Sequence, residues 1–396
     1  MTRRKASAKA PGRLDFLGGV ADYSGSLVLE MPLRLETTVT IQDLPRDAFV
    51  FTSRQEAPFE TDLTPAISDL PKWVRYLYGS FLLFCAEHRW APRQGLSFSV
   101  DSRVPLSMGV SSSAALEVAT MRALEAFSGK RFKGTGLARL AQRAENDVVG
   151  APCGLMDQLA SAYGTRGRLL PILCRPDVLH QSLALPSGVI AVGWPSGVKH
   201  AVSDSPYATA RAGAFMGKAI VNRTCGRNVT HATELRPGEV RALSLAQLPE
   251  TILGAEFIRK FGAVDDPLTA IEPGRVYPVR SALLFPVEEH FRVETATALL
   301  SGVTRSNRQA TLGLLGELLH QSHAGYSSIG LGCAETDQMV AGVRGLGPAK
   351  GFYGARVSGG GSGGTVVVLL ERASLPALGR LARRLRLPAR PTAFLQ

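Results

Sequence analysis

The sequence predicts an α+β protein of two domains. Stretches with strand-like alternation and stretches with helical periodicity are mixed along the chain. The 396 residues exceed what a single hydrophobic core usually serves. A glycine-rich loop at residues 359–364 runs directly into a β-branched segment at 365–370, so a strand must follow the loop. We expect one domain over residues 1–205 and the other over 206–396.

Bulk composition is that of an ordinary globular protein, with 45% apolar and 20% charged residues. No apolar stretch approaches the roughly 20 residues of a membrane span, and the N-terminus lacks the apolar segment of a signal peptide. We therefore expect a soluble, cytoplasmic protein with no membrane partner. The five cysteines are scattered and form no C-x-x-C pair, which favours reduced thiols over disulfides or zinc ligands.

The net charge of +12 would attract polyanions, so a nucleic-acid partner has to be considered. The basic residues gather near the two ends of the chain, without interleaved aromatic residues or a recognisable reading helix. They are Arg3, Arg4, Lys5, Arg380, Arg383, Arg384, Arg386 and Arg390. We interpret them as solvated ends and expect no nucleic-acid partner.

The glycine loop is the most informative segment. Its spacing Gly359-x-Gly361-x-x-Gly364 fits a dinucleotide fingerprint, but that fingerprint needs a helix after it, and here a strand follows. A Rossmann site is thus excluded, and no G-x-x-x-x-G-K-[ST] sequence offers a P-loop. Glycines still let backbone N–H groups approach an anion closely. A glycine-rich hairpin or linker is the alternative interpretation.

A second loop of small residues, 105–115, leads into a predicted helix that ends at Gly129. The apolar face of this helix is formed by Leu116, Ala119, Ala123, Leu124 and Phe127. The serines at its start should cap it, and the N–H groups there also suit a phosphate. Three consecutive serines, Ser111, Ser112 and Ser113, offer further hydroxyls to phosphate or Mg²⁺. The alternative is a merely well-capped helix.

Three other segments complete the organisation. Residues 13–16 alternate as in a half-buried strand and lead into a loop that contains Asp22; taken singly, Arg13 and Asp22 would be surface charges. A helical pattern carries Glu145 and is broken at Gly150. Residues 222–278 are irregular, as in a variable insertion, and helical patterns return from about Phe291.

These loops, in this order, resemble the GHMP family of small-molecule kinases, and within it the galactokinase branch. Residues 11–25 look like the sugar-binding signature, 104–114 like the phosphate loop and 357–364 like the third motif, while 144–158 resembles the stretch with the magnesium and base carboxylates. The resemblance implies a two-domain fold: an N-terminal domain with a left-handed βαβ unit and a ferredoxin-like C-terminal domain, with the active site in the cleft between them.

The resemblance also implies roles. Asp157 would act on the sugar hydroxyl, with Arg13 beside it and beside the transferring phosphoryl group. ATP would be bound by Trp73, Gly109, Ser111, Ser112, Ser113, Gly360 and Gly361, and Mg²⁺ by Ser113 and Glu145. The sugar would contact Asp22, Gly19, Val20 and Tyr207. An arginine beside Asp157 weakens it as a base, so orienting the hydroxyl and accepting its proton late stays an alternative.

Within the family, the loops are most similar to the kinase domain of the L-arabinokinases, here expected alone, without an additional N-terminal domain. Where galactokinases carry Glu-His, near the C6 hydroxyl of the sugar, this chain has Gly19-Val20. L-arabinopyranose lacks that hydroxymethyl group, and Val20 could fill the space. We expect an ATP-dependent L-arabinose 1-kinase whose partners are ATP and a monosaccharide. Restoring Glu and His at these positions should favour galactose.

Two alternatives remain open. A galactokinase or a uronic-acid 1-kinase of the same fold would use the same machinery. A non-enzymatic sugar sensor would bind ATP and sugar without turnover, although it would have no need to keep the serines, Glu145 and Asp157 together. The sequence does not indicate an oligomeric state.

Overall fold

The computed structural model describes residues 4–198, 206–385 and 395–396. The chain forms two compact units, which are described separately. The first comprises Met1–Arg13, Pro32–Leu106 and Ser111–Arg166, and the second Leu14–Met31, Ser107–Val110 and Gly167–Gln396. These interleaved units differ from a simple division at residues 205 and 206, which stays a prediction. Ser205 and, of the basic residues named above, Arg3, Arg386 and Arg390 lie outside the described residues.

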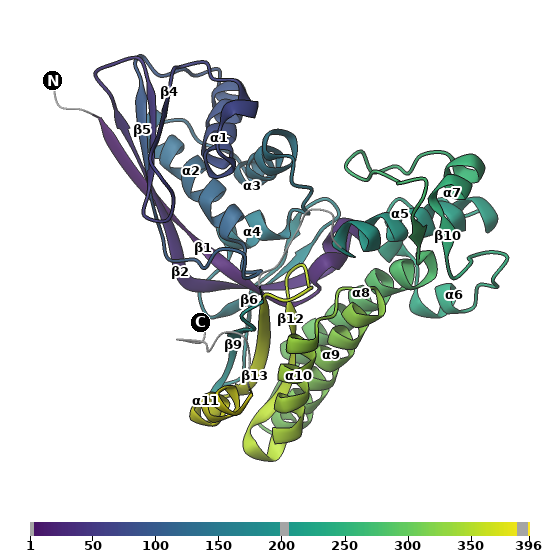
Figure 1. The fold of residues 1–396 in the computed structure, drawn as a ribbon. Coiled ribbons are helices and arrows are strands. Elements are labelled where there is room, and N and C mark those ends of the chain that lie inside the picture. Colours follow the sequence, from purple (N-terminus) through teal and green to yellow (C-terminus); the bar gives the residue numbers. More distant parts are fainter. Residues whose placement is uncertain (1–3, 199–205, 386–394) are drawn as a thin grey trace. The chain divides into compact units, whose positions relative to one another are not determined.

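The first unit is a sheet with helices. Strands β4 (Phe59–Thr61), β3 (Phe49–Ser53), β5 (Leu96–Ser102) and β2 (Leu27–Asp43) are neighbours in that order, and β1 (Lys5–Leu17) pairs with β2. The connecting turn is η2 (Ile67–Asp69), and the helices are α1 (Lys72–His88), α2 (Ser112–Ser128), α3 (Gly136–Arg143) and α4 (Met156–Tyr163). Helices α1, α3 and α4 each pack against α2 (Figure 1).

Aromatic side chains from β3, α1 and β5 fill part of this unit's core. The rings of Phe49 and Phe81 meet edge to face with centroids 5.0 Å apart, and those of Phe51 and Phe98 stack at 5.2 Å. Burial of such rings is a large apolar contribution to stability. The predicted helix after the serine loop is confirmed as α2, and Gly129 ends it in the left-handed conformation with φ of 79°.

Strand β1 is buried on both faces at its C-terminal end. Its residues alternate in exposure only up to Ala10, and Arg13, Leu14, Asp15 and Phe16 are all buried. The prediction of a strand here is confirmed, but the prediction that this strand is half-buried is wrong. Charged residues on a doubly buried strand need partners, which makes Arg13 and Asp15 candidates for function rather than surface charges.

The second unit contains a three-stranded antiparallel sheet in the order β12 (Phe352–Ser358), β13 (Thr365–Glu371) and β9 (Val189–Pro195). Helix α9 (Arg308–Ser328) and helix α10 (Ala334–Leu346) pack against β12 (Figure 1). The segment 365–370 forms a strand as predicted. The loop at 359–364 therefore connects two antiparallel strands as a β-hairpin, which leaves its role in anion binding a prediction, and a Rossmann site stays excluded because no helix follows it.

Helix α8 (Val279–Ser301) starts well before Phe291, where helical patterns were expected to return. In the same unit, the first residues of β2 pair with β6 (Arg168–Leu173). Strand β6 also pairs with β7 (Val178–Leu179) and β8 (Leu183–Ala184). The turn η1 (Gly19–Ser24) lies between β1 and β2, and η5 (Pro348–Lys350), η6 (Arg372–Ser374) and α11 (Leu375–Arg384) complete the C-terminal part.

The segment 222–278 is built from short elements that follow α5 (Pro206–Thr224): η4 (Ala232–Glu234), α6 (Pro237–Arg241), β10 (Ile252–Leu253), α7 (Gly254–Phe261) and β11 (Val276–Tyr277). Their apolar side chains share one cluster with α5 and α8, in which Met216, Phe257 and Leu283 are fully buried. All five cysteines are free thiols. In the described part of the chain, no helix combines the length and apolar character needed to cross a membrane.

Candidate functional site

In the first unit, a buried arginine binds a partly exposed aspartate. The Nη2 and Nε atoms of Arg13 lie 2.6 and 2.8 Å from Oδ1 of Asp157. The side chains are 3% and 23% exposed, respectively. Asp157 is the second residue of α4, and α4 is tied to β1 by the Ser161 hydroxyl, which donates to the Pro11 carbonyl at 2.8 Å. The structure thus brings the two predicted catalytic residues together and leaves the carboxylate accessible.

Glu145 lies on η3 (Ala144–Val149), a π-helical turn between α3 and α4 that ends at Gly150. Such turns widen a helix and often occur at functional sites. The Ser113 hydroxyl lies close enough to the Glu145 carboxylate to favour its charged form, so the two predicted Mg²⁺ ligands are neighbours. Burial, together with the charge of Asp157, raises the pKa of Glu145 to about 7.

A second buried carboxylate, Glu117, lies beside Glu145. The Nε2 atom of Gln158 donates to both, at 3.1 Å from Glu117 Oε2 and 2.9 Å from Glu145 Oε2. Glu117 and Gln158 are fully buried, and burial raises the pKa of Glu117. Sequence reasoning missed both. Glu117 lies on the same helical face as Ala114 and Met121, and that face is buried. A carboxylate on an otherwise apolar helical face was the signal that could have identified it.

The start of α2 corrects one expectation. Ser111 is the N-cap residue, but its backbone is left-handed with φ of 57° and its side chain makes no capping bond. Its Oγ is buried and has no hydrogen-bond partner among the described residues. The prediction of a serine cap is therefore wrong. A buried hydroxyl without a partner, beside the free N–H groups of a helix start, is suited to an anion.

Two aromatic residues were predicted as ligand contacts. Trp73, near the start of α1, is half-buried and meets the ring of Phe51 edge to face, with centroids 6.4 Å apart. Tyr207, at the start of α5, is also half-buried and lies edge to face against Tyr23, with centroids 6.0 Å apart. In the same unit as Tyr207, Asp22 is buried on η1, rather than a surface charge.

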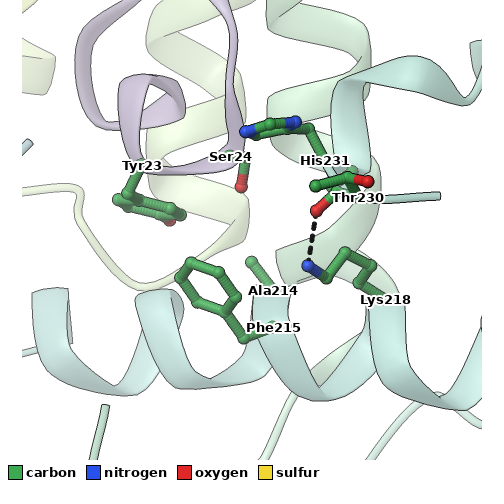
Figure 2. Close-up of a pocket in the computed structure, with 8 residues that line it drawn as sticks. Tyr23, Ser24, Ala214, Phe215, Lys218, Thr230 and His231 are labelled. Atoms are coloured by element: carbon green, nitrogen blue, oxygen red, sulfur yellow. Dashed lines mark hydrogen bonds between the residues drawn. The ribbon is translucent and has the colours of Figure 1, made fainter. Parts of the chain in front are cut away.

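Helix α5 carries a cationic cluster next to Tyr23. Arg211 lies over the Tyr23 ring, 5.3 Å from its centroid, and forms a buried ion pair with Asp266 at 2.9 Å. Further along α5, the Lys218 ammonium donates to the Thr230 carbonyl at 2.7 Å, as Figure 2 shows. Tyr23, Phe215, Lys218 and His231 are among the residues that line a cavity of about 10 Å³, room for about one water molecule.

The second unit also holds a buried network that sequence reasoning missed. Arg356 Nη1 lies 2.9 Å from Asp15 Oδ1, and neither side chain is exposed. Asp15 accepts the Gly19 N–H on Oδ1 and the Gly359 N–H on Oδ2, both at 3.0 Å. The Asp15 carboxylate therefore joins the first loop to the glycine loop.

The glycine loop uses several of its N–H groups within the protein. Besides that of Gly359, the N–H of Ser362 donates to the Leu331 carbonyl and that of Gly364 to the Val198 carbonyl. Gly360 is half-buried, and Gly361 is buried in a left-handed conformation with φ of 77°. The Thr365 hydroxyl donates to the Met108 carbonyl at 2.8 Å, so the segment around Gly109 lies against this loop.

The comparisons with known proteins agree with this combination of fold and motifs. The N-terminal domain of the GHMP kinases matches residues 75–165, and their C-terminal domain matches residues 305–386. The chain belongs to the GHMP kinase family. Its two-domain fold with mixed helix and sheet content is that of the family, as expected from the sequence.

Among its relatives, L-arabinokinase of Arabidopsis thaliana is 34% identical over 91% of this chain, and the chain spans 42% of that protein's length. Galactokinase of Chloroflexus aggregans is 32% identical over 92% of this chain and 83% of its own. In structure, the galactokinase of Lactococcus lactis in complex with galactose covers 95% of this chain and 88% of its own with a TM-score of 0.78 at 20% identity. Mevalonate kinase of Methanococcus jannaschii covers 96% of this chain and 95% of its own, with a TM-score of 0.63 at 14% identity.

Proposed function

We propose that this chain is an ATP-dependent sugar kinase that phosphorylates the anomeric hydroxyl of a monosaccharide, converting L-arabinose to L-arabinose 1-phosphate. The ion pair between Arg13 and Asp157 carries the proposal. A carboxylate that is held on one oxygen by a buried guanidinium, and is still partly exposed, can orient a hydroxyl group. The same guanidinium supplies positive charge where a phosphoryl group would be transferred.

In the proposed reaction, the sugar O1 atom forms a bond to the γ-phosphorus of ATP, and the bond from that phosphorus to the bridging oxygen of ADP breaks. The proton of the O1 hydroxyl passes to Asp157. Because Arg13 holds only one oxygen of the Asp157 carboxylate, the other oxygen can orient the hydroxyl first and accept its proton late in the step. Arg13 offsets negative charge on the transferring group.

The oxygen atoms of Ser113 and Glu145 suit Mg²⁺, a hard cation that prefers oxygen ligands. Among the described residues, no group of three or more His, Cys, Asp or Glu side chains is arranged to hold a metal ion. Such a sparse protein site fits Mg²⁺ that is shared with nucleotide phosphates. When bound, Mg²⁺ would neutralise phosphate charge. We propose that Ser111, Ser112, Gly109, Gly360 and Gly361 contact the phosphates and Trp73 the adenine.

For the sugar, we propose contacts with Asp22, Tyr207 and the Gly19–Val20 turn. Both turn residues are buried, and Val20 packs in an apolar cluster. The turn therefore offers no polar side chain to an exocyclic hydroxymethyl group. L-arabinopyranose lacks that group, so no hydroxyl is left without a partner when it binds. An apolar site rejects an added hydroxyl by only about 10²-fold, so weak activity on D-galactose is expected.

A galactokinase or a uronic-acid 1-kinase is the second candidate. The galactokinase relatives at about 30% identity support it, whereas Gly19 and Val20 favour L-arabinose. A sugar sensor without turnover would have no use for the Arg13–Asp157 pair.

The test is an ATP-coupled assay over aldoses and uronic acids, followed by phosphorus NMR of the product. We expect the highest kcat/KM with L-arabinose, a lower value with D-galactose and a still lower one with D-glucose, and a phosphate on C1. Phosphate on another carbon, or no turnover of any sugar, would contradict the kinase proposal. A preference for galactose would contradict only the choice of sugar.

A further inference from the structure

Gly19 lies in a space that leaves no room for a side chain. Its φ is +49°, and a Cβ atom there would lie 1.8 Å from the Tyr326 hydroxyl oxygen. The same Cβ would lie 2.8 Å from Arg356 Nη2 and 2.8 Å from Asp15 Oδ2. A side chain at position 19 would thus clash most closely with Tyr326, and also with the buried Asp15–Arg356 ion pair.

Tyr326 is fixed in this place from all sides. Its ring meets Phe285 edge to face with centroids 5.3 Å apart, and the Arg356 guanidinium lies 5.0 Å from its centroid. Its side chain has no exposed surface and belongs to the same apolar cluster as Val20. Rotation of the ring away from Gly19 would therefore disturb packing on several sides.

The Tyr326 hydroxyl also joins two loops. It donates to the Gly359 carbonyl at 2.7 Å and accepts the N–H of Val20 at 3.0 Å. Asp15 makes a parallel connection, from the Gly19 N–H to the Gly359 N–H. The position of the Gly19–Val20 turn is thus set by the Tyr326 hydroxyl as well as by the chain itself.

We propose that Tyr326 is a specificity-determining residue of the sugar site, because it takes the space of a side chain at position 19 and fixes the turn without one. The inference rests on the proposed function. By keeping position 19 without a side chain, Tyr326 favours pentopyranoses, which have no exocyclic hydroxymethyl group. A glutamate at position 19 alone would not restore galactose preference, because Tyr326 and the Asp15–Arg356 pair already fill the space. The sequence-based expectation of a shift towards galactose concerned Glu and His together at positions 19 and 20.

Four variants test this: Tyr326→Phe, Tyr326→Leu, Gly19→Glu and Gly19→Glu with Tyr326→Leu. Leucine keeps the position apolar while removing the hydroxyl and part of the ring. We expect Gly19→Glu to lower the melting temperature sharply and the double variant to recover part of that loss. The ratio of kcat/KM for L-arabinose to that for D-galactose should fall about tenfold in the double variant and about threefold in Tyr326→Phe.

The matched control is Tyr353→Phe in the same unit, whose hydroxyl bonds to Glu371 at 2.6 Å and not to either loop. It should leave the sugar ratio unchanged. The proposal is overturned if Tyr326→Phe keeps the wild-type ratio, or if Tyr326→Leu gives Gly19→Glu no recovery in melting temperature. That thermal recovery does not depend on any substrate. A wild-type protein without sugar turnover would contradict the proposed function instead.

Discussion

Arg13 and Asp157, 144 residues apart in the chain, meet through two nitrogens of one side chain and a single oxygen of the other. Charge-assisted contacts of this kind are stronger and more directional than neutral hydrogen bonds. The arginine is buried and the aspartate is not, so the pair presents a fixed carboxylate to a ligand.

The first prediction concerns the ion pair between Arg13 and Asp157. Asp157→Asn keeps the shape of the side chain but removes its charge and its ability to accept a proton. We expect kcat to fall by about 10² or more, the usual contribution of a positioned base, with ATP affinity retained. Steady-state kinetics and calorimetric ATP titration measure this. Arg13→Ala should also lower kcat, and a folded Asp157→Asn protein with wild-type kcat would remove the aspartate from the mechanism.

The second prediction uses the unbonded hydroxyl of Ser111. Ser111→Ala should raise KM for ATP by roughly 10- to 100-fold, as expected for one lost hydrogen bond to a charged group. Ser80→Ala is the control, because the Ser80 hydroxyl on α1 is likewise buried without a described partner but is not part of the serine loop. It should leave KM for ATP unchanged. Equal KM values in both variants would argue against phosphate binding at Ser111.

The third prediction concerns the segment 222–278, which contributes two neighbouring aspartates to α5. Asp266 forms a buried ion pair with Arg211, while the Asp265 side chain is 60% exposed and binds Lys218. Asp266→Asn leaves a buried arginine without its counter-charge, which should cost about 3 kcal/mol of stability. Because Arg211 packs on Tyr23, against which Tyr207 lies, KM for the sugar should also rise about tenfold.

The matched variant Asp265→Asn should cost less stability than Asp266→Asn and leave the sugar KM unchanged, because Asp265 is itself 60% exposed and the buried Lys218 ammonium still donates to the Thr230 carbonyl. Chemical denaturation and kinetics on both variants give the comparison. If the two substitutions had the same effect on KM, Arg211 would have no part in positioning Tyr207.

The fourth prediction is a pH dependence of stability from His290. Burial lowers the pKa of His290 to about 4, aided by Arg175 and Arg236 and opposed by Glu294. Its Nδ1 accepts the Leu27 N–H at 2.8 Å, which requires that nitrogen to be unprotonated. The unfolded chain binds a proton near pH 6.5 and the folded one near pH 4. Stability from this group is complete above pH 6.5 and is lost as the pH falls towards 4.

Between pH 7 and pH 5 the loss should be on the order of 2 kcal/mol, because about 1.5 pKa units of the difference fall in that interval and each corresponds to about 1.4 kcal/mol. His290→Asn keeps an acceptor for the Leu27 N–H but does not titrate. Urea unfolding at pH 7 and pH 5 should show a smaller pH effect in the variant than in the wild type. An identical pH effect in both proteins would exclude His290 as the cause.

The sequence was sufficient to predict the elements that have regular patterns. The helix that ends at Gly129 and the strand after the glycine loop follow from periodicity and from β-branched residues, which act locally. The pairing of Arg13 with Asp157 was expected from the family resemblance, since neither residue stands out in its own segment.

Other features depend on contacts between distant segments, and no local pattern reports them. The sequence suggested that Ser111 caps the helix, but its backbone is left-handed and its hydroxyl makes no capping hydrogen bond. In the sequence, Asp15 resembles the polar residue of an alternating strand. Only the contact with Arg356, 341 residues away in the chain, makes its burial favourable. Tyr326 reads as an ordinary core residue of a helix.

The bond between Asp15 and Arg356 also orders events during synthesis. A ribosome produces the chain from its N-terminus at about 5–20 residues per second, so the aspartate emerges many seconds before its partner. Until then, burying the C-terminal half of β1 would leave a charge without compensation, which is costly. The native packing of the second unit around Asp15 therefore requires Arg356 to have been synthesised, although Asp15 belongs to the first strand of the chain.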